Sequence, residues 1–479
     1  MDHGLATRPP FEPDGTLAAR APVPPPPEPE GRAQRSAAAV RGEIARLIVG
    51  LDRLIGEQLD RVLHHPRFQR LEALWRGVAW LDEGMAGDPQ LKLRILNVRW
   101  AELERDFDRA MVFDRTVLFD KVYSDEFGRP GGEPFGMLVV DHPVHHRPDR
   151  DGVDDVSILS GLAEVAAASF CPVVLGVDPR MLGLDSFAEL DLRQDISGTF
   201  QGREYARFQK LRTEADCRFV ACVLPRLLMR EPHSGRNFPR FGIRYDERVD
   251  DHGDMLWGSA AFALASVAAR AMRIHRWPAN IRGVHAAQDG GVVDGPDRVH
   301  LPADKRGVVA RFPTENAVSE SQEVELNLLG LTALRQCHLT GSAGFFNVPS
   351  LHQPPLLDGE AARVNARISA NIHYILCVCR FAHYIKVIAR EWIGRYRTAD
   401  EMQRLLENWI QDYVTTTDDA GAEMRARYPL GEASVEVTER PGAPGSFDAV
   451  VHLRPHFQLD QLTSEFQLAT PVGHAVGRG

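Results

Sequence analysis

The chain has 479 residues, which is long enough for two or three domains that each bury a hydrophobic core. Hydrophobic residues make up 44% of the sequence and charged residues 25%, proportions that are ordinary for a soluble globular protein. The formal net charge is −10, so a nucleic acid is not an expected partner.

Cysteine usage and the distribution of apolar residues predict a cytoplasmic protein. The six cysteines form no CxxC pair, which favours free thiols in a reducing compartment. The N-terminus has no basic start followed by an apolar segment, so we expect no signal peptide. The most apolar stretch, 158–177, contains Glu164 and Pro172, and a buried helix followed by a buried strand explains it better than a membrane span. Direct membrane insertion is therefore not expected.

The start of the chain falls into two segments. Residues 1–36 are rich in proline, alanine and charged residues, and this composition predicts a disordered tail. Over 37–63, apolar residues recur every three or four positions, which predicts an amphipathic helix with a coiled-coil-like stripe. The residues of this stripe are Val40, Ile44, Leu47, Leu51, Leu54 and Ile55. Such a helix either packs on its own domain or docks a partner, and the pattern leaves both open.

Residues 64–355 are predicted to form a mixed α/β core, because strand and helix patterns follow one another there. The first helix of this core starts at Pro66 and is expected to place Phe68, Leu71, Trp75, Val78 and Leu81 on one face. Further helices are expected over 102–123, 153–169 and 256–270, and strands over 91–98, 137–140, 172–177 and 219–224. A loop with short strands is expected over 288–313, where glycine and proline are frequent.

Residues 356–479 are predicted to form a C-terminal domain of long helices and a β-hairpin. One continuous helix is expected over 361–393, and a capping box from Thr398 to Glu401 predicts the start of another. Two alternating strands follow, over 433–439 and 446–454, before a short glycine-rich tail. A lone hairpin is marginally stable in water and leaves open edges, so we expect strands from elsewhere to complete this sheet.

The sequence lacks the common motifs of nucleotide binding and of hydrolases. It contains no GxxxxGK[ST] phosphate loop, no GxGxxG after a strand and no GxSxG nucleophile elbow. His142, His145 and His146 follow a strand, and histidine is a common metal ligand. Their spacing matches no known zinc pattern, however, and they lead into a polar loop. An exposed turn is therefore the favoured interpretation.

A second group of metal-ligand residue types lies within the helix predicted over 361–393. His373 and Cys377 share one face of this helix, while Cys379 and His383 share another. The four side chains therefore do not converge on one ion, and core packing is favoured. We expect no metal site, no cofactor and no catalytic residues.

Eight segments, in chain order, resemble the large subunit of the type VI secretion system contractile sheath (the TssC/VipB family). They are HPRFQRLEALWRG at 65–77, LFDKVY at 118–123, GGEPFG at 131–136, LPRLLMR at 224–230, LWG at 256–258, PTE at 313–315, RFAHYIK at 380–386 and LRPHFQ at 453–458. Each segment is weak evidence by itself, and the ordered set is strong evidence.

The resemblance implies a multi-domain structural protein with an N-terminal docking helix, a mixed α/β core, and C-terminal helices with a β-hairpin. It implies co-assembly with a small sheath subunit (TssB/VipA-like) and neighbouring sheath protomers into a helical tube around inner-tube hexamers (Hcp-like). The tube is expected to be attached to a baseplate and to expel the inner tube by contracting. An AAA+ unfoldase is expected to act on the contracted sheath.

Two surfaces are expected to carry this assembly. We expect the stripe over 40–55 to dock the small subunit, and the resemblance implies that the hairpin strands enter a sheet shared between protomers. The residues expected in the shared sheet are Val435, Val437, Phe447, Ala449, Val450, Val451 and Leu453. Two alternatives remain at this point, namely a sheath subunit of a phage-tail-like injection device and a metal-dependent cytoplasmic hydrolase that uses His142, His145 and His146.

Overall fold

The computed structural model describes residues 37–110, 112–129, 131–148, 152–193, 195–234, 245–284, 290–295, 312–337, 342–355, 358–392, 398–415, 421–440, 447–456 and 466–472. The first helix, α1 (Ala37–Leu63), confirms the predicted helix and is continuous over 27 residues. The chain divides after Glu57 into two compact units, so the last turns of α1 belong to the second unit. The tail predicted over 1–36 lies outside the described residues.

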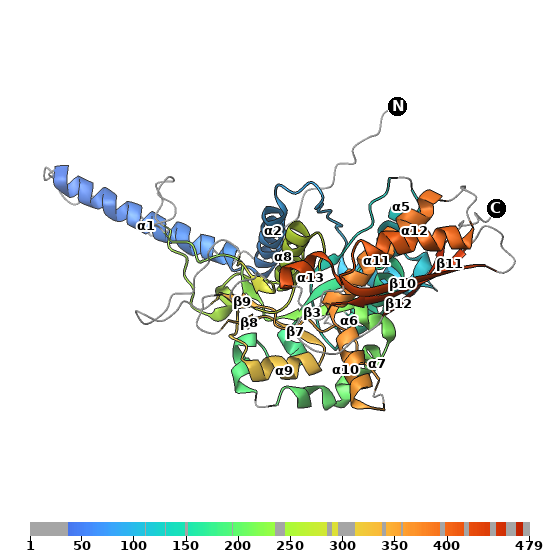
Figure 1. The fold of residues 1–479 in the computed structure, drawn as a ribbon. Helices are drawn as coiled ribbons and strands as arrows, with labels where there is room; N and C mark the ends of the chain where they lie inside the picture. Colours follow the sequence, from blue (N-terminus) through green and yellow to red (C-terminus); the bar gives the residue numbers. More distant parts are fainter. Residues whose placement is uncertain are drawn as a thin grey trace. The chain divides into compact units, whose positions relative to one another are not determined.

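A four-stranded parallel sheet lies at the centre of the second unit, with strand order β1-β2-β3-β7. The strands are β1 (Leu138–Val144), β2 (Val173–Val177), β3 (Val220–Leu224) and β7 (Leu331–Ala333). Helix α6 (Asp155–Ser169) covers one face and helix α8 (Ala261–His275) the other (Figure 1). Val173 and Leu175 of β2 pack with α6, while Val174 between them packs with α8. The sheet is therefore buried on both faces, as parallel sheets require.

The apolar stretch over 158–177 forms the end of α6 and all of β2, so the predicted buried helix and buried strand are confirmed. The segment Ile372–Arg390 of helix α11 (Ile372–Trp392) is long and apolar enough to cross a membrane by length and composition alone, and 67% of it is buried inside the fold.

Helix α2 (Pro66–Met85) packs on α8 through a face that the sequence does not single out. Its buried residues are Ala73, Gly77, Trp80 and Leu81. A Cβ atom at Gly77 would lie 2.5 Å from the Phe262 ring, so glycine allows the close approach of the two helices. Of the five residues predicted to share a face, Phe68, Leu71 and Trp75 are exposed, whereas Leu81 is buried. Packing against α8, rather than the number of apolar residues on each face, decides which face is buried.

The strand predicted over 91–98 is wrong. The chain from Leu91 to Arg99 has no helix, turn or bend, and no described strand pairs with it. Lys92 forms an ion pair with Glu133, and Arg94 forms one with Glu126. The alternation of charged and apolar residues therefore reflects ion pairs on one side of an extended segment and not a strand in a sheet.

The helix predicted over 102–123 is broken into several pieces, which also corrects the sequence prediction. They are α3 (Trp100–Arg109), η1 (Phe113–Arg115), α4 (Val117–Phe119), the π-helical η2 (Asp120–Ser124) and α5 (Asp125–Phe127). The Asp106 carboxylate accepts hydrogen bonds from the Val117 and Leu118 N–H groups, and the Thr116 hydroxyl accepts one from Phe119. These bonds cap a new helical start, so the chain turns at Ala110 instead of continuing.

The helix expected over 361–393 is likewise two helices, α10 (Glu360–Ser369) and α11. The break lies at Asn371, which forms a β-bridge with Pro349. The Ala370 carbonyl accepts from the Ser350 N–H, and the Ile372 N–H donates to Val348. Backbone groups that a continuous helix would use internally are thus bonded to a neighbouring segment. Residue 393 lies outside the described residues.

The remaining elements complete the core. They are η3 (Pro179–Leu182), η4 (Phe187–Leu192), η5 (Ser197–Gln201), η6 (Arg203–Tyr205), α7 (Ala206–Arg212), η7 (Ala215–Phe219), β4 (Leu227–Leu228), η8 (His252–Asp254), β5 (Trp257–Gly258), β6 (Val292–Val293), α9 (Glu320–Leu328), β8 (Arg335–Gln336) and β9 (Ala343–Gly344). Because Trp257 and Gly258 pair with β4, α8 begins at Ala261 and not at the predicted 256. Most of the loop predicted over 288–313 lies outside the described residues.

A buried ion pair joins three segments that are distant in the sequence. The Glu315 carboxylate accepts two hydrogen bonds of 2.6 Å from the Arg226 guanidinium. It also accepts from the Ser186 hydroxyl and from the Phe187 N–H. Glu315 is buried, and a carboxylate removed from water is tolerated only when it is paired.

Replacing Arg226 with Met should lower the free energy of unfolding by about 3–5 kcal/mol, because the buried Glu315 charge loses its cation. The matched control is Arg248→Met, since Arg248 and its partner Asp250 are both exposed. An exposed pair contributes about 1 kcal/mol or less. Urea unfolding followed by circular dichroism measures both variants, and equal losses would contradict the prediction.

Candidate assembly site

The C-terminal hairpin forms as predicted and belongs to a three-stranded antiparallel sheet of order β10-β11-β12 (Figure 1). Strand β10 (Leu430–Glu439) pairs with β11 (Phe447–Pro455), with Val435 opposite Val451 and Val437 opposite Ala449. Strand β12 (Phe466–Val472) pairs with the other edge of β11. Strand β11 is therefore the central strand of this sheet.

Side chains of the hairpin alternate between a buried and a partly exposed face. Six of the seven residues expected in a shared sheet are buried against helices α11 and α12 (Ala399–Gln411). They are Val435, Val437, Phe447, Ala449, Val451 and Leu453. The seventh, Val450, lies on the opposite face between Glu436 and Ala469. The six buried side chains thus hold the sheet on its own helices.

Strand β12 corrects the expectation that a short glycine-rich tail follows the hairpin. Its seven residues pair one by one with Phe447–Leu453, so the chain itself supplies one of the missing strands. The alternation of Phe466, Leu468, Thr470 and Val472 is the sequence signal that could have revealed it. Pro471 cannot donate a ladder hydrogen bond and suits an edge strand.

The outer edge of β10 is partly occupied by its own chain. The Gln411 side-chain amide of α12 donates to the Ala433 carbonyl, and the Val437 N–H donates to the Gln403 side chain, each over 3.3 Å. Leu430 donates to the Tyr413 carbonyl and accepts from the Thr415 N–H. In the described part of the chain no strand pairs with the outer edge of β12. The two edges of the sheet are therefore not equivalent.

The stripe predicted on α1 is exposed to solvent along its length. Its six residues, Val40, Ile44, Leu47, Leu51, Leu54 and Ile55, are between 38% and 64% exposed. Six large apolar side chains on one face of a helix form an unusually apolar surface for a soluble chain. Exposure is what a docking surface requires, and the docking itself stays a prediction.

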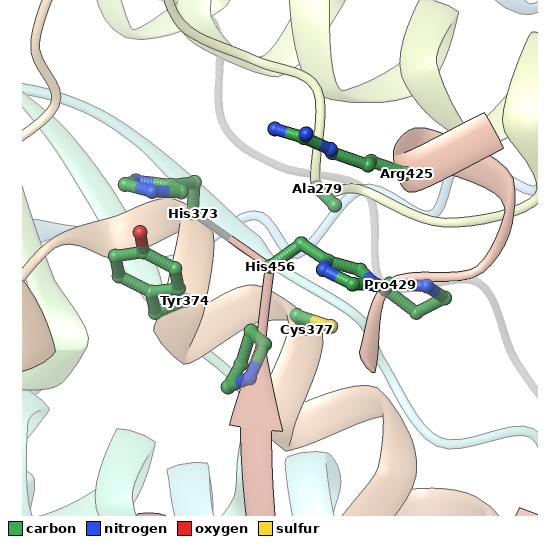
Figure 2. Close-up of a pocket in the computed structure, with 8 residues that line it drawn as sticks. Ala279, His373, Tyr374, Cys377, Arg425, Pro429 and His456 are labelled. Atoms are coloured by element: carbon green, nitrogen blue, oxygen red, sulfur yellow. The ribbon is translucent and has the colours of Figure 1, made fainter. Parts of the chain in front are cut away.

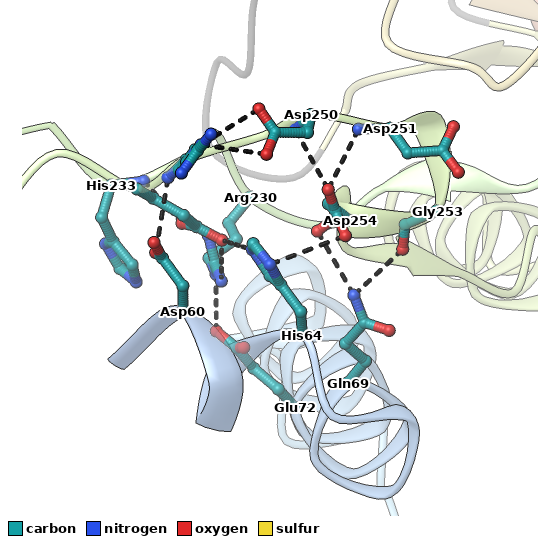
Figure 3. A network of polar contacts seen from close by, with 12 residues as sticks. Asp60, His64, Gln69, Glu72, Arg230, His233, Asp250, Asp251, Gly253 and Asp254 are labelled. Carbon is teal, nitrogen blue, oxygen red and sulfur yellow. Dashed lines mark hydrogen bonds and ion pairs between the residues drawn. The ribbon is translucent and has the colours of Figure 1, made fainter. Parts of the chain in front are cut away.

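A buried network of charged groups holds the α1–α2 corner (Figure 3). Arg230 lies between two carboxylates, with its Nε 2.8 Å from Glu72 of α2 and its Nη1 2.6 Å from Glu247. Burial would raise the pKa of Glu247, but hydrogen bonds from Arg230 and the His233 N–H outweigh it and lower the pKa. His64, which follows α1 directly, lies 3.1 Å from Glu247.

A second contact fixes the last turn of α1 to the same network. The Tyr245 hydroxyl donates to the Asp60 carboxylate over 2.6 Å. Asp60 and Glu72 Oε1 are both bonded within this network, whereas Glu72 Oε2 is buried without a hydrogen-bond partner among the described residues. The end of α1 and the start of α2 are therefore held rigidly by the residues around Glu247.

The three histidines considered as metal ligands do not lie in an exposed turn, so that prediction is wrong. His142 lies within β1, stacks on Trp100 with ring centroids 4.1 Å apart, and hydrogen-bonds Asp155. His145 and His146 are both buried, each 7% exposed. His146 stacks on Tyr205. No group of three metal-ligand residue types converges anywhere in the described residues.

The histidines and cysteines of α11 are buried, as predicted. His383 hydrogen-bonds the Ser169 carbonyl, and burial raises the pKa of Cys377 to about 12. His373 and Cys377 line a small cavity together with His456 (Figure 2). The cavity offers about 10 Å³ to the centre of a water molecule, which is room for roughly one water and too little for a substrate.

Acid should destabilise the fold through these buried histidines. Burial lowers the pKa of His146 and of His383 to about 4, with His145 and Arg147 adding to the effect at His146 and Glu204 opposing it. An unfolded histidine has a pKa of about 6.5. The unfolded state therefore binds more protons between these values, so stability is greatest above pH 6.5 and is lost as the pH falls toward 4.

The temperature at the midpoint of thermal unfolding should accordingly be lower at pH 5.0 than at pH 7.5. His146→Phe keeps a ring against Tyr205 but has no titrating group, so its midpoint should fall less than that of the wild type. His452→Gln, on the partly exposed face of β11, is the control and should behave as the wild type. An unchanged pH dependence in His146→Phe would contradict the assignment.

Comparison with known proteins identifies the family. A family model described as EvpB/VC_A0108, tail sheath N-terminal domain, matches residues 45–352. A second, described as EvpB/VC_A0108, tail sheath gpW/gp25-like domain, matches residues 361–472. The type VI secretion system sheath protein TssC1 of Pseudomonas aeruginosa is 35% identical over 437 residues, which cover 90% of this chain and 86% of that protein.

Among solved structures, the cryo-EM structure of the anti-feeding prophage (AFP) baseplate covers 75% of this chain and 76% of its own. Its TM-score of 0.34 and identity of 10% are too low to support an argument. The family models match most of the chain in one continuous order, with both sheath domains present. The chain therefore belongs to the family of large subunits of the type VI secretion system contractile sheath.

Proposed function

We propose that this sheath subunit co-assembles with a small sheath subunit in the cytoplasm, and that the pair polymerises into a helical tube around hexamers of an inner tube. The observation that supports this most is the exposed stripe of α1. Each Å² of apolar surface left in water costs about 25 cal/mol relative to burial, so a partner that covers the stripe gains substantial free energy. Neighbouring protomers, a baseplate and an AAA+ unfoldase are the further partners of this proposal.

The proposed role is mechanical and needs no catalytic residue. Contraction proceeds without a bound nucleotide if the extended lattice has a higher free energy than the contracted one, which buries more interface. A net charge of −10 argues against nucleic acid as a partner. The metal-dependent hydrolase is not favoured, because the His142 ring hydrogen-bonds Asp155 and the His145 Nδ1 accepts from the Arg147 N–H.

The proposed link between protomers is a shared sheet joined through backbone hydrogen bonds. Such bonds form an extended ladder that survives the rotation of rigid domains, so subunits stay connected while the lattice rearranges. The burial of Val451 and Leu453 against α11 and α12 keeps the sheet attached to its own domain. The outer edge of β12 is the edge on which we place the joint, since the edge of β10 is partly occupied by Gln403 and Gln411.

Replacing both Leu47 and Leu51 with Ser should weaken binding of the small subunit at least roughly 100-fold, because each buried Leu contributes about 1.5 kcal/mol or more. Val49→Ser is the matched control. Val49 is 68% exposed but lies two residues from each Leu and therefore on the opposite face of α1. Co-purification of the co-expressed subunits measures the effect. Equal binding by the double variant and the control would contradict docking through the stripe.

Replacing Val450 and Val451 with Pro should abolish sheath tubules, because neighbouring residues of the central strand donate to opposite neighbours and Pro donates to neither. The small subunit should still co-purify, since α1 is unchanged. Val450→Thr keeps the backbone donor and should give normal tubules. Electron microscopy distinguishes the variants, and tubules of normal length from the Pro variant would rule out the shared sheet.

A further inference from the structure

The outward face of α2 carries a second apolar stripe that the proposed docking of α1 does not explain. Phe68, Leu71 and Trp75 lie three and four residues apart on one face and are 37%, 52% and 56% exposed. We call these three residues the α2 stripe. A Trp that is more than half exposed is unusual on a free surface, whereas Trp is enriched among residues that dominate the energy of protein interfaces.

The α2 stripe lies on a helix that is held firmly from behind. Trp80 and Leu81 are buried on the opposite face, and Gly77 allows contact with Phe262 of α8. At the start of the helix, Glu72 is bonded to the buried Arg230 (Figure 3). A surface fixed in this way loses little conformational freedom on binding, which favours affinity. The stripe is therefore preorganised.

Charged residues at the two ends of α2 are placed against the helix dipole. Arg67 and Arg70 lie in its first turns, and Asp82 and Glu83 lie in its last turn. All four are exposed, and none forms an ion pair with a residue in the described ranges. Positive charge at an N-terminus and negative charge at a C-terminus each cost about 0.3–1 kcal/mol. The unbound helix thus carries an electrostatic cost that a partner of opposite polarity would relieve.

We propose that the α2 stripe docks an amphipathic helix of a second sheath polypeptide, lying parallel to α2, with acidic residues in its first turn and basic residues in its last. This inference rests on the proposed function, since the partner is a sheath polypeptide. Parallel packing places the acids of the partner beside Arg67, which flanks the α2 stripe, and its bases beside Asp82 and Glu83. These two ends of α2 are about 24 Å apart at 1.5 Å per residue, so the partner helix needs four to five turns.

A second copy of this chain is a poorer occupant than a different helix. Two α2 helices are complementary only when antiparallel, which is an isologous contact with two-fold symmetry. Such a contact closes on itself and gives a dimer, whereas a helical tube grows through heterologous contacts. An ordinary helix already carries acids at its start and bases at its end, which is the polarity that α2 requires.

Three variants of the full chain, each co-expressed with the small sheath subunit, test the proposal. The stripe variant carries Leu71→Ser and Trp75→Ser. The charge-reversed variant carries Arg67→Glu, Asp82→Lys and Glu83→Lys. The control carries Val324→Ser and Leu328→Ser on α9, where both side chains are exposed to a similar degree, 55% and 52%. Tubule yield by electron microscopy and the thermal midpoint of the chain alone are measured for each.

The stripe and charge-reversed variants should each lose at least about tenfold in tubule yield, while the control assembles as the wild type. The charge-reversed chain should also melt higher than the wild type, because its end charges now agree with the helix dipole. Gain of stability with loss of assembly is a combination that mere damage to the fold does not produce. Normal assembly by either variant, or equal loss in the control, would overturn the proposal.

Two further measurements separate the remaining outcomes. If wild-type chain and small subunit form no tubules, the proposed function itself fails. A wild-type chain that sediments alone as a dimer, which the stripe variant abolishes, would overturn the proposal in favour of a second copy. Oxidative labelling of Trp75 in wild-type protein needs no variant to fold. At least fivefold protection in tubules relative to the free chain supports the proposal, and equal labelling overturns it.

Discussion

The central parallel sheet must be covered on both faces, and this constraint decides where most of the chain lies. Residues of β2 alternate between α6 and α8, so both helices are committed to the core. Helix α2 then covers α8, and its remaining face is directed away from the core. The outer face of α2 is therefore left for another polypeptide, on a helix whose inner face is already fixed.

Electrostatics at the α1–α2 corner follow the same division between inside and outside. Asp60 and Glu72 are bonded within the network around Arg230 and Glu247. The arginines of the first turns of α2 remain outside, where no acid of the described chain neutralises them. The helices of this corner are held in place by the buried network, and the charges of the exposed arginines are not neutralised. Such a surface is well suited to recognition, because binding requires little reorganisation.

The sequence predicts those elements whose periodicity is decided locally. The helix over 37–63, the two strands of the hairpin and the capping box at Thr398 all follow from short-range patterns. The errors arise where a distant segment competes for backbone groups or for a face. Pairing with Pro349 interrupts the helix expected over 361–393, and α8 selects the buried face of α2. Within the candidate site, the sequence predicts the apolar stripe of α1 and the hairpin of β10 and β11. It does not predict β12, because the alternation of β12 is short and its partner strand lies upstream of residues 457–465.

The inequality of the two edges of the C-terminal sheet gives the joint a direction. A sheet whose two edge strands both carry unpaired backbone groups can add further strands at either edge without limit. Here two glutamines of α12 and the segment at Tyr413 occupy backbone groups on the β10 side. In the proposed assembly, each subunit then accepts a neighbouring strand on one side only. If the proposed joint lies on the β12 edge, this asymmetry protects unassembled subunits from growing into an amyloid-like ribbon.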